Sequence, residues 1–432
     1  MTRSSLFAAL LLGLAACQAS TDDTRPPAGN VPETAAAFDG AAAWDEFEAR
    51  LNASYAYIDL IDADDRRALF DRARSRAASA AGPEAVRALM HRTAHAFSDP
   101  HLIVGPFTDT DPNIVMTSAD LRARVEGGTV RIADVRAESA ADRAGVRPGW
   151  TVVQMDDRSV MDGVRAIHDG LIPAPTARQL DYAATLVVNG TRGAQTRRFL
   201  FETESGEAVR VDLGSPRTFA REVADRAPVS HRTVGAARDI GYIRIENSLG
   251  DNATIHAFDA AVEALAGTRA MIVDLRNTPS GGNTEVGRSI IGHFLTEPRI
   301  YQIHTIPAVE REFGVPRRFA EYALPRAPYH AGPLYVLHGA WTGSMGEGLV
   351  VGLDGAADAV TVGADMGDLL GGLWNFDLAL SGARVDLGGE ALFHPDGTPR
   401  EDYVADIALE AADRAADGSD AALAEALRQI EG

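Results

Sequence analysis

The sequence is poor in cysteine and lacks an excess of basic charge. Cys17 is the only cysteine, so no intramolecular disulfide can form. Acidic residues outnumber basic ones by 61 to 41, which gives a formal net charge of −20. These charges are spread without long single-sign runs, which indicates a soluble protein and excludes the nucleic-acid backbone as a partner. Long apolar runs are also missing, apart from one near the N-terminus that is too short to span a bilayer stably.

What is present is enough to build a large folded protein. The chain has 432 residues, of which 46% are hydrophobic. This length allows two or three domains with a sizeable core, and the hydrophobic content excludes a disordered chain. The sequence shows no metal-ligand cluster or phosphate-binding loop of known spacing, so we expect no metal and no cofactor.

The N-terminus has the pattern of an export signal. A charged start at Arg3 is followed by the apolar run 6–16 and by small residues before Cys17. Leu-Ala-Ala-Cys also resembles the bacterial lipobox, in which the cysteine becomes the lipidated first residue. This resemblance implies a lipid anchor at Cys17 on the periplasmic side of a bacterial cell envelope, and Gln18 favours the outer membrane. An ordinary export signal that happens to contain a cysteine is the alternative.

The composition changes along the chain predict seven segments. We expect a lipoprotein signal peptide (1–17), a polar, proline-rich flexible linker (18–37), an N-terminal helical subdomain (38–106), a compact β-rich module (107–175), a β-rich connecting region (176–235), a domain of alternating strands and helices (236–415) and a C-terminal helix (416–432). In the connecting region, short alternating runs such as 184–188 and 196–201 predict strands.

Residues 130–157 predict a strand, a short helix ended by Gly145, a Pro148-Gly149 turn and a second strand. This order resembles a PDZ domain, except that Trp150 stands where aspartate is usual. PDZ modules bind extended peptide termini by adding a strand to a sheet edge. A scaffold module without a peptide site is the alternative.

From about residue 238 the pattern alternates between strands and helices. Strands are predicted at 240–245 and 270–276, and helices at 256–265 and 285–295. This alternation favours a largely parallel sheet. The loop after 270–276 and the turn after the apolar run 334–337 would both leave the carboxyl ends of strands, where open α/β sheets gather their active sites.

These two loops and one segment further upstream carry the candidate catalytic residues. Ser344 lies at a predicted strand-to-helix turn, where it is either a nucleophile or only a helix N-cap. The bare backbone amides of Gly281 and Gly282, together with the amide of Met345, could form an oxyanion hole. His101 follows the helix-stopping residues 98–100 and is a candidate base at an element boundary.

Together these motifs resemble the C-terminal-processing (tail-specific) serine peptidases, whose family also includes the tricorn protease core and the interphotoreceptor retinoid-binding proteins. The resemblance covers about residues 95–410. The motifs are Asp99-Pro100-His101, Asp274-Leu275-Arg276-Asn277 with Ser280-Gly281-Gly282, Thr342 to Glu347, and Gly397 to Glu401 with Ala405-Asp406-Ile407. The resemblance implies an α+β multi-domain fold with a helical subdomain, a PDZ-like β-rich module and an α/β catalytic domain of the crotonase/ClpP-like kind.

Within this family the serine is activated in one of two ways. The processing peptidases use a lysine downstream of the serine, but here Asp368 stands near that position and no lysine lies nearby. The resemblance therefore implies the tricorn-like branch, in which His101 is the base and Glu401 orients it. Two departures are Pro100, where that branch has a serine, and the altered segment 402–406. Asp99, Glu390 and Asp402 are alternative third members.

The sequence thus predicts a serine-type peptidase, a hydrolase that cleaves exported proteins or peptides by acyl transfer through Ser344. Its expected partner is a polypeptide, bound as an extended chain or by its C-terminus. Two alternatives remain. One is a catalytically inactive homologue that binds peptides or lipophilic molecules on the same scaffold, and the other is an esterase.

Overall fold

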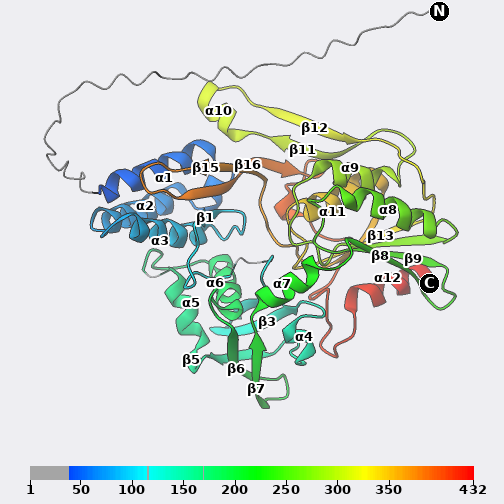
Figure 1. Ribbon diagram of the computed structural model, residues 1–432, viewed down its shortest axis with the longest axis horizontal. Helices are drawn as coiled ribbons and strands as arrows, with labels where there is room; N and C mark the ends of the chain where they lie inside the picture. The colour runs from blue at the N-terminus through cyan, green and yellow to red at the C-terminus, as the bar shows by residue number, and fades with distance from the viewer. Residues whose placement is uncertain (1–37, 114–115, 169) are drawn as a thin grey trace, which may run out of the picture. The chain divides into compact units, whose positions relative to one another are not determined.

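The computed structural model describes residues 38–113, 116–168 and 170–432. The predicted signal peptide and linker, with Cys17, lie outside these residues. The described residues form three sheets and several groups of helices, which confirms the predicted α+β multi-domain class (Figure 1). Among them, no helix is both long and apolar enough to cross a membrane.

The first described segment is helical, as predicted. Its elements are α1 (Gly40–Ser54), η1 (Ile58–Leu60), α2 (Ala63–Ala78), α3 (Pro83–Ala94) and η2 (His95–Phe97). The helices pack around aromatic side chains, and the Trp44 ring meets those of Phe47 and Phe70 edge-on at 5.3 and 6.1 Å. Ser98 ends the helical run with a left-handed backbone (φ 52°), so the chain turns just before His101.

A five-stranded antiparallel sheet with one added short strand follows, in the order β2-β3-β4-β6-β7. We call residues 119–214 the β2–β7 module. Its elements are β2 (Leu121–Glu126), β3 (Thr129–Val135), α4 (Ala140–Arg143), β4 (Thr151–Met155), β5 (Arg158–Ser159), α5 (Val160–His168), α6 (Ala177–Asn189), β6 (Thr196–Glu202) and β7 (Ala208–Gly214).

The module continues beyond the predicted limit at residue 175, because β6 pairs with β4 in the same sheet. The strand predicted at 184–188 is wrong, since these residues lie in α6. Their β-branched side chains favour a strand, but a reciprocal capping box between Thr176 and Gln179 begins a helix upstream of them. The strand predicted at 196–201 is confirmed as β6.

The predicted catalytic domain is built on a largely parallel sheet, with the strand order β17-β14-β13-β10-β9-β8. Only β8 runs antiparallel to its neighbour. This edge strand lies in the region that the sequence assigned to the connecting segment. The elements are α7 (Pro216–Ala224), β8 (Val229–Val234), β9 (Ile240–Ile245), α8 (Ala253–Ala264), β10 (Ala270–Asp274), α9 (Thr284–Gly292), β13 (Leu334–His338), α11 (Met345–Ala357), β14 (Val360–Gly363), β17 (Ile407–Ala408) and α12 (Ala421–Glu431).

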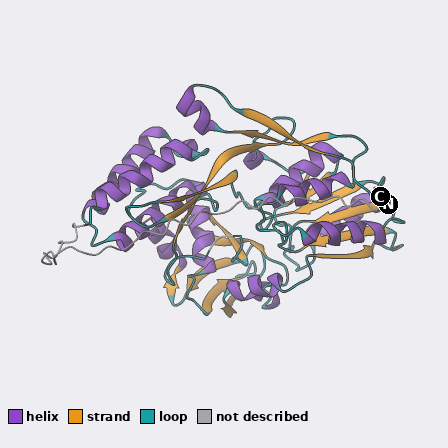
Figure 2. Cartoon of the chain, turned by 45° about the horizontal axis from the view of Figure 1, so that its top comes forward, coloured by secondary structure: helices purple, strands orange, loops and turns teal. Residues whose placement is uncertain are grey.

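Helices cover both faces of this sheet (Figure 2). Apolar residues of α8, α9 and α11 form one buried cluster with Val273 and Val336 of the central strands. On the other face, Ala422 and Ala426 of the C-terminal helix α12 pack against Ile272. The central strands are therefore buried on both sides, as expected for near-continuous apolar runs in a parallel sheet.

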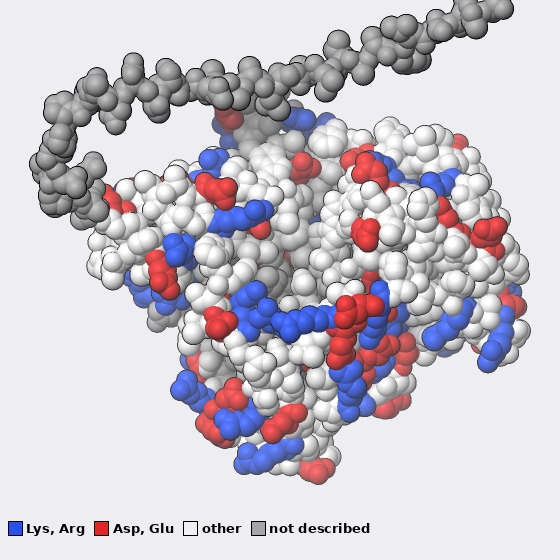
Figure 3. Space-filling model, viewed as in Figure 1, with Lys and Arg blue, Asp and Glu red and all other residues white. Residues whose placement is uncertain are grey.

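The third sheet links distant parts of the chain, since β16 pairs with β1, β11 and β15. Its elements are β1 (Ile103–Gly105), β11 (Arg299–Thr305), β12 (Arg318–Ala323), β15 (Gly372–Asp377) and β16 (Arg384–Phe393), with α10 (Pro307–Phe313) between β11 and β12 and η3 (Arg400–Asp402) after β16. This pairing brings the segment of His101 onto the catalytic domain. On the face drawn in Figure 3, acidic and basic side chains are intermingled rather than separated by sign.

One buried ion pair ties the start of β2 to β6 inside the module. Arg197 donates to both carboxylate oxygens of Asp120 at 2.8 Å, and both side chains are fully buried. Removing one partner of such a pair leaves the other charge buried and uncompensated. We expect Arg197→Ala to lower the free energy of unfolding of the module by about 3–5 kcal/mol in urea titrations.

The neighbouring Arg198 supplies the control, because it pairs with Asp156 at 3.6 Å on the surface. Exposed pairs of this kind contribute about 1 kcal/mol or less, so Arg198→Ala should change the unfolding free energy little. Equal losses of unfolding free energy in Arg197→Ala and Arg198→Ala would contradict the expectation that the buried ion pair contributes more than the exposed one.

Candidate active site

The two predicted site loops meet because their strands are neighbours. β10 and β13 run parallel, with Asp274 opposite Leu337, so both loops leave the same edge of the sheet. Beyond the strands, the N–H of Gly343 donates to the carbonyl of Thr278 at 3.0 Å. This confirms the predicted placement of both loops at the carboxyl ends of strands.

Ser344 occupies the turn between β13 and α11, also as predicted. It stands at the N-cap of α11 with φ 55° and ψ −115°, a backbone conformation that costs a non-glycine residue about 1–3 kcal/mol. Two glycines allow the tight approach of the two loops. A Cβ at Gly346 would lie 2.5 Å from Thr278 Oγ1, and one at Gly343 would lie 2.9 Å from the carbonyl oxygen of Pro279. Such strain is typical of functional sites.

The hydroxyl of Ser344 contacts the predicted oxyanion loop through a carbonyl. Ser344 Oγ donates to the carbonyl oxygen of Gly281 at 3.2 Å. In a trans peptide, the C=O of Gly281 and the N–H of Gly282 point in opposite directions. The Gly282 amide therefore faces away from Ser344 in this state. Among the described residues, the N–H of Met345 has no hydrogen-bond partner, so it is free to donate near the hydroxyl.

His101 lies in the loop between η2 and β1, and its side chain is buried. Its Nδ1 is 3.0 Å from the carbonyl oxygen of Leu370. Because a carbonyl only accepts, Nδ1 carries the proton and Nε2 keeps its lone pair, which is the tautomer that a general base needs. Burial lowers the pKa of His101 to about 4, so the ring is neutral at pH 7.

Asp99 binds the backbone around His101 and not its ring. Its carboxylate accepts the N–H of His101 at 2.8 Å, the N–H of Leu370 at 3.2 Å and the hydroxyl of Tyr55 at 2.7 Å. Burial raises the pKa of Asp99 to about 7. The residue thus holds the loop of His101 against the segment that contains Leu370.

The other candidate acids lie in different surroundings. Glu401 lies in η3, its Oε2 is buried without a hydrogen-bond partner, and burial raises its pKa. Glu390 accepts from Nδ1 of His304 at 2.8 Å, and Asp402 is exposed. Within the described part of the chain, no hydrogen bond or ion pair joins Ser344, His101 and Glu401 to one another. The role of Glu401 stays a prediction.

A buried ion pair that sequence reasoning had not singled out connects Ser344 with the segment beside His101. Oε2 of Glu347 accepts the N–H of Ser344 at 2.9 Å and lies 3.2 Å from Nη2 of Arg400. Its Oε1 accepts the N–H of Leu369 at 3.3 Å. Arg400 donates in turn to the carbonyls of Ser344 at 3.2 Å and Leu369 at 2.5 Å. The Ser-x-x-Glu spacing of a capping box was the available sequence signal.

Burial raises the pKa of Glu347, while the Arg400 guanidinium and the N–H groups of Ser344 and Leu369 lower it and favour the ionised carboxylate. Glu347 and Arg400 are both at most 5% exposed. The pair therefore fixes the nucleophile turn to residues 369–370, and the carbonyl of Leu370 holds His101. Ser344 and His101 belong to one continuous buried network.

Asp368, which stands near the position of the lysine in processing peptidases, lines a cavity of about 300 Å³ together with Pro100, Gly367 and Arg178. Burial raises the pKa of Asp368, and its carboxylate lies 3.8 Å from Arg178. This cavity lies directly beside the loop of His101, because Pro100 precedes that residue.

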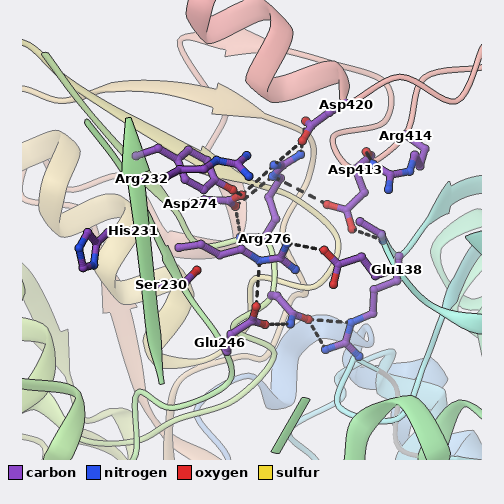
Figure 4. Close-up of a pocket in the computed structure, with 15 residues that line it drawn as sticks. Glu138, Ser230, His231, Arg232, Glu246, Asp274, Arg276, Asp413, Arg414 and Asp420 are labelled. Atoms are coloured by element: carbon purple, nitrogen blue, oxygen red, sulfur yellow. Dashed lines mark hydrogen bonds and ion pairs between the residues drawn. The ribbon is translucent and has the colours of Figure 1, made fainter. Parts of the chain in front are cut away.

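The loop that carries the glycine pair is anchored by a second polar network. Arg136, buried at the end of β3 in the β2–β7 module, donates to Asn277 Oδ1 at 2.9 and 2.5 Å, and Asn277 also bonds to the carboxylate of Glu246. These residues border a polar cavity of about 350 Å³, in which Arg276 bonds to Asp274 and Asp420 (Figure 4). The lining includes none of the predicted catalytic residues, and its charges are largely paired with one another.

The nucleophile loop also contacts the module directly. The indole N–H of Trp341 donates to the carbonyl of Ala119 at 3.0 Å, and its ring is buried with Leu186 of α6. Both site loops therefore rest on the β2–β7 module as well as on the central sheet.

Comparison with known families assigns the catalytic domain. Residues 239–407 match the model of peptidase family S41. The chain carries a peptidase family S41 domain. This confirms the resemblance to C-terminal-processing peptidases at the level of the family, and it supports a peptidase function, for which the family implies a polypeptide substrate.

Solved structures support the fold around the S41 domain. The mature form of CPAF has a TM-score of 0.60 at 14% identity, covering 91% of this chain and 96% of that chain. The photosystem II D1 C-terminal processing protease has a TM-score of 0.53 at 15% identity, covering 86% and 93%. At these identities the likeness shows the fold. No curated protein sequence matches the chain.

The environment of His101 predicts its titration. In ¹⁵N-edited histidine spectra, we expect the His101 ring to titrate near pH 4 and to show the Nδ1–H tautomer, with the signal assigned through a His101→Gln variant. Since the folded pKa lies below the ordinary value of 6.5, the stability contributed by the neutral ring is lost as the pH falls from 6.5 toward 4. Titration at the ordinary value, or an Nε2–H tautomer, would contradict the geometry.

Proposed function

We propose that this S41 peptidase is a serine-type enzyme that cleaves peptide bonds by acyl transfer through Ser344. The observation that carries this proposal is the buried network from the strained Ser344 turn, through Glu347 and Leu369, to the Leu370 carbonyl that holds His101. It places a hydroxyl at a helix N-terminus in the same network as a neutral imidazole of the correct tautomer.

In this proposal, Nε2 of His101 takes the proton of Ser344 as the hydroxyl attacks the substrate carbonyl, and it returns the proton to the leaving amine. Water then hydrolyses the acyl-enzyme with the same base. The sequence contains no lysine at all, so a Ser/Lys dyad within the chain is excluded. Glu401 would stabilise the imidazolium, and its unpaired buried oxygen supports a role in binding a polar group.

The oxyanion hole requires one rearrangement. The amide of Met345 is free, but the Gly281 carbonyl faces the serine hydroxyl. A turn of the peptide between Gly281 and Gly282 would replace this carbonyl with an N–H. Each donor of this kind contributes about 3–4 kcal/mol to transition-state stabilisation. We therefore propose that substrate binding turns this peptide over.

The same carbonyl favours a second candidate, a catalytically inactive homologue that binds peptides or lipophilic molecules. An enzyme whose Gly281 carbonyl stayed in place would have only one oxyanion donor. An esterase that uses the same serine is the remaining variant of the main proposal. For the location, we propose an exported protein anchored through a lipid on Cys17, which the lipobox-like segment supports.

A fluorophosphonate probe separates the two candidates. We expect the wild-type chain to be labelled and Ser344→Ala to be unlabelled, with Ser230→Ala, an exposed serine on β8, labelled like the wild type. Peptide binding without labelling or turnover would support the inactive homologue. Equal labelling of wild type and Ser344→Ala would exclude Ser344 as the nucleophile.

A pair of neighbouring acids tests the third catalytic member. Glu401→Gln should lower kcat by about 10²–10⁴-fold if this residue orients or stabilises His101. Asp402→Asn, the control on the same 3₁₀ turn, should keep kcat within about twofold because its side chain is exposed. If the two variants behave alike, Glu401 is not the third member.

A further inference from the structure

The β2 strand of the β2–β7 module lies at the edge of its sheet. Helix α6 covers the side of β2 that has no neighbouring strand. In the sheet order β2-β3-β4-β6-β7, strand β2 has a neighbour only on the side of β3. If the module is PDZ-like, a free edge of this kind is where an extended peptide would add as a further strand. Figure 1 shows α6 beside the strands of the module.

Three side chains of α6 bond to the backbone of β2. Asn189 accepts the N–H of Leu121 at 3.3 Å and donates to its carbonyl at 2.7 Å. Thr185 accepts the N–H of Ala123 at 3.1 Å and donates to its carbonyl at 2.9 Å. These are the same N–H and C=O groups through which an added strand would pair.

A third contact completes the row. Asp181 Oδ1 accepts the N–H of Val125 at 2.6 Å. The outward-facing amides of residues 121, 123 and 125 are therefore all bonded to α6.

The spacing of these contacts explains how a helix can substitute for a strand. Positions 181, 185 and 189 are four residues apart and rise along one helix face by about 6 Å per step. Positions 121, 123 and 125 are two residues apart and rise by about 6.8 Å per step. The two repeats stay in register over these two steps, with α6 running antiparallel to β2.

The helix is also part of the module's core. Ala183, Ala184 and Val188 of α6 are buried in one cluster with Leu121 and Ala123 of β2. Asn189 is fully buried, and Thr185 is 4% exposed. Displacing α6 would expose this apolar surface and leave the polar groups unpaired, which costs far more than a weakly bound peptide could offset.

We propose that α6 is the permanent internal occupant of the β2 edge, so the module does not capture a substrate terminus there by strand addition. Resting on the proposed peptidase function, this inference also specifies the substrate class. The enzyme accepts internal peptide segments and requires no free C-terminal carboxylate held at β2. The module acts instead as a rigid support for the site loops.

Hydrogen exchange tests the closed edge without any need for cleavage. In Ser344→Ala, the amides of Ala123 and Val125 should exchange within tenfold of the interior amide of Ile132 on β3. Thr185→Val should speed exchange at Ala123 at least tenfold, while Thr196→Val, an exposed threonine on β6, should leave it unchanged. The proposal would be overturned if, with Thr185 in place, the amides of Ala123 and Val125 exchanged as fast as the amides on the outer edge of β7. This comparison needs no substitution in α6, so it holds even if Thr185→Val fails to fold.

A peptide pool tests the missing docking site. Ten-residue peptides with four randomised C-terminal residues and a free carboxylate should leave exchange at 121–126 unchanged at millimolar concentration. Slower exchange in this segment would overturn the proposal.

The substrate class is tested with matched free-acid and C-terminally amidated peptides, for which kcat/KM should agree within threefold. A kcat/KM that is tenfold higher for the free acid than for the amide would overturn the proposed substrate class. If neither peptide were cleaved, the proposed peptidase function would be contradicted. Hydrogen exchange at Ala123 and Val125 would still decide whether α6 closes the edge of β2.

Discussion

The buried pair of Glu347 and Arg400 is the interaction on which the site depends most. One carboxylate accepts the amides of Ser344 and Leu369, and one guanidinium donates to the carbonyls of the same two residues. A charge pair buried at this depth is costly unless both partners are fully bonded, and removing one partner leaves the other charge uncompensated. The nucleophile turn and the segment that holds His101 are therefore fixed as a single unit.

The parallel pairing of β10 and β13 provides the second constraint. It brings the glycine loop and the nucleophile turn to one edge of the sheet, and close backbone contact at Gly343 and Gly346 keeps them together. The β2–β7 module supports both loops, through Arg136 on Asn277 and through Trp341 on Ala119. This arrangement gives the module a mechanical role that does not depend on peptide binding.

Much of this could be predicted from the sequence, because apolar periodicity and turn residues determine the elements directly. The strand at 240–245 and the helix after Ser344 follow from such patterns, and the order of the motifs indicates the family. The segment 184–188 shows the limit of propensity. Its valines favour a strand, yet the cap at Thr176 and the contacts to β2 make it helical.

Other features depend on backbone groups that every residue has. The partner of the His101 ring is the carbonyl of Leu370, and no residue type marks such an acceptor. Likewise, the direction of the Gly281 carbonyl is a property of one peptide plane, and two glycines permit either orientation. The distinction between a formed and an unformed oxyanion hole therefore required the structure.

The central claim is that Ser344 is a nucleophile whose oxyanion hole forms when the peptide after Gly281 turns over. A crystal structure of the chain after reaction with a peptidyl phosphonate tests this most directly. The account predicts a covalent bond to Ser344 Oγ, with the N–H groups of Gly282 and Met345 both donating to the phosphonyl oxygen. An unmodified Ser344, or a phosphonylated Ser344 with the Gly281 carbonyl unmoved, would contradict it.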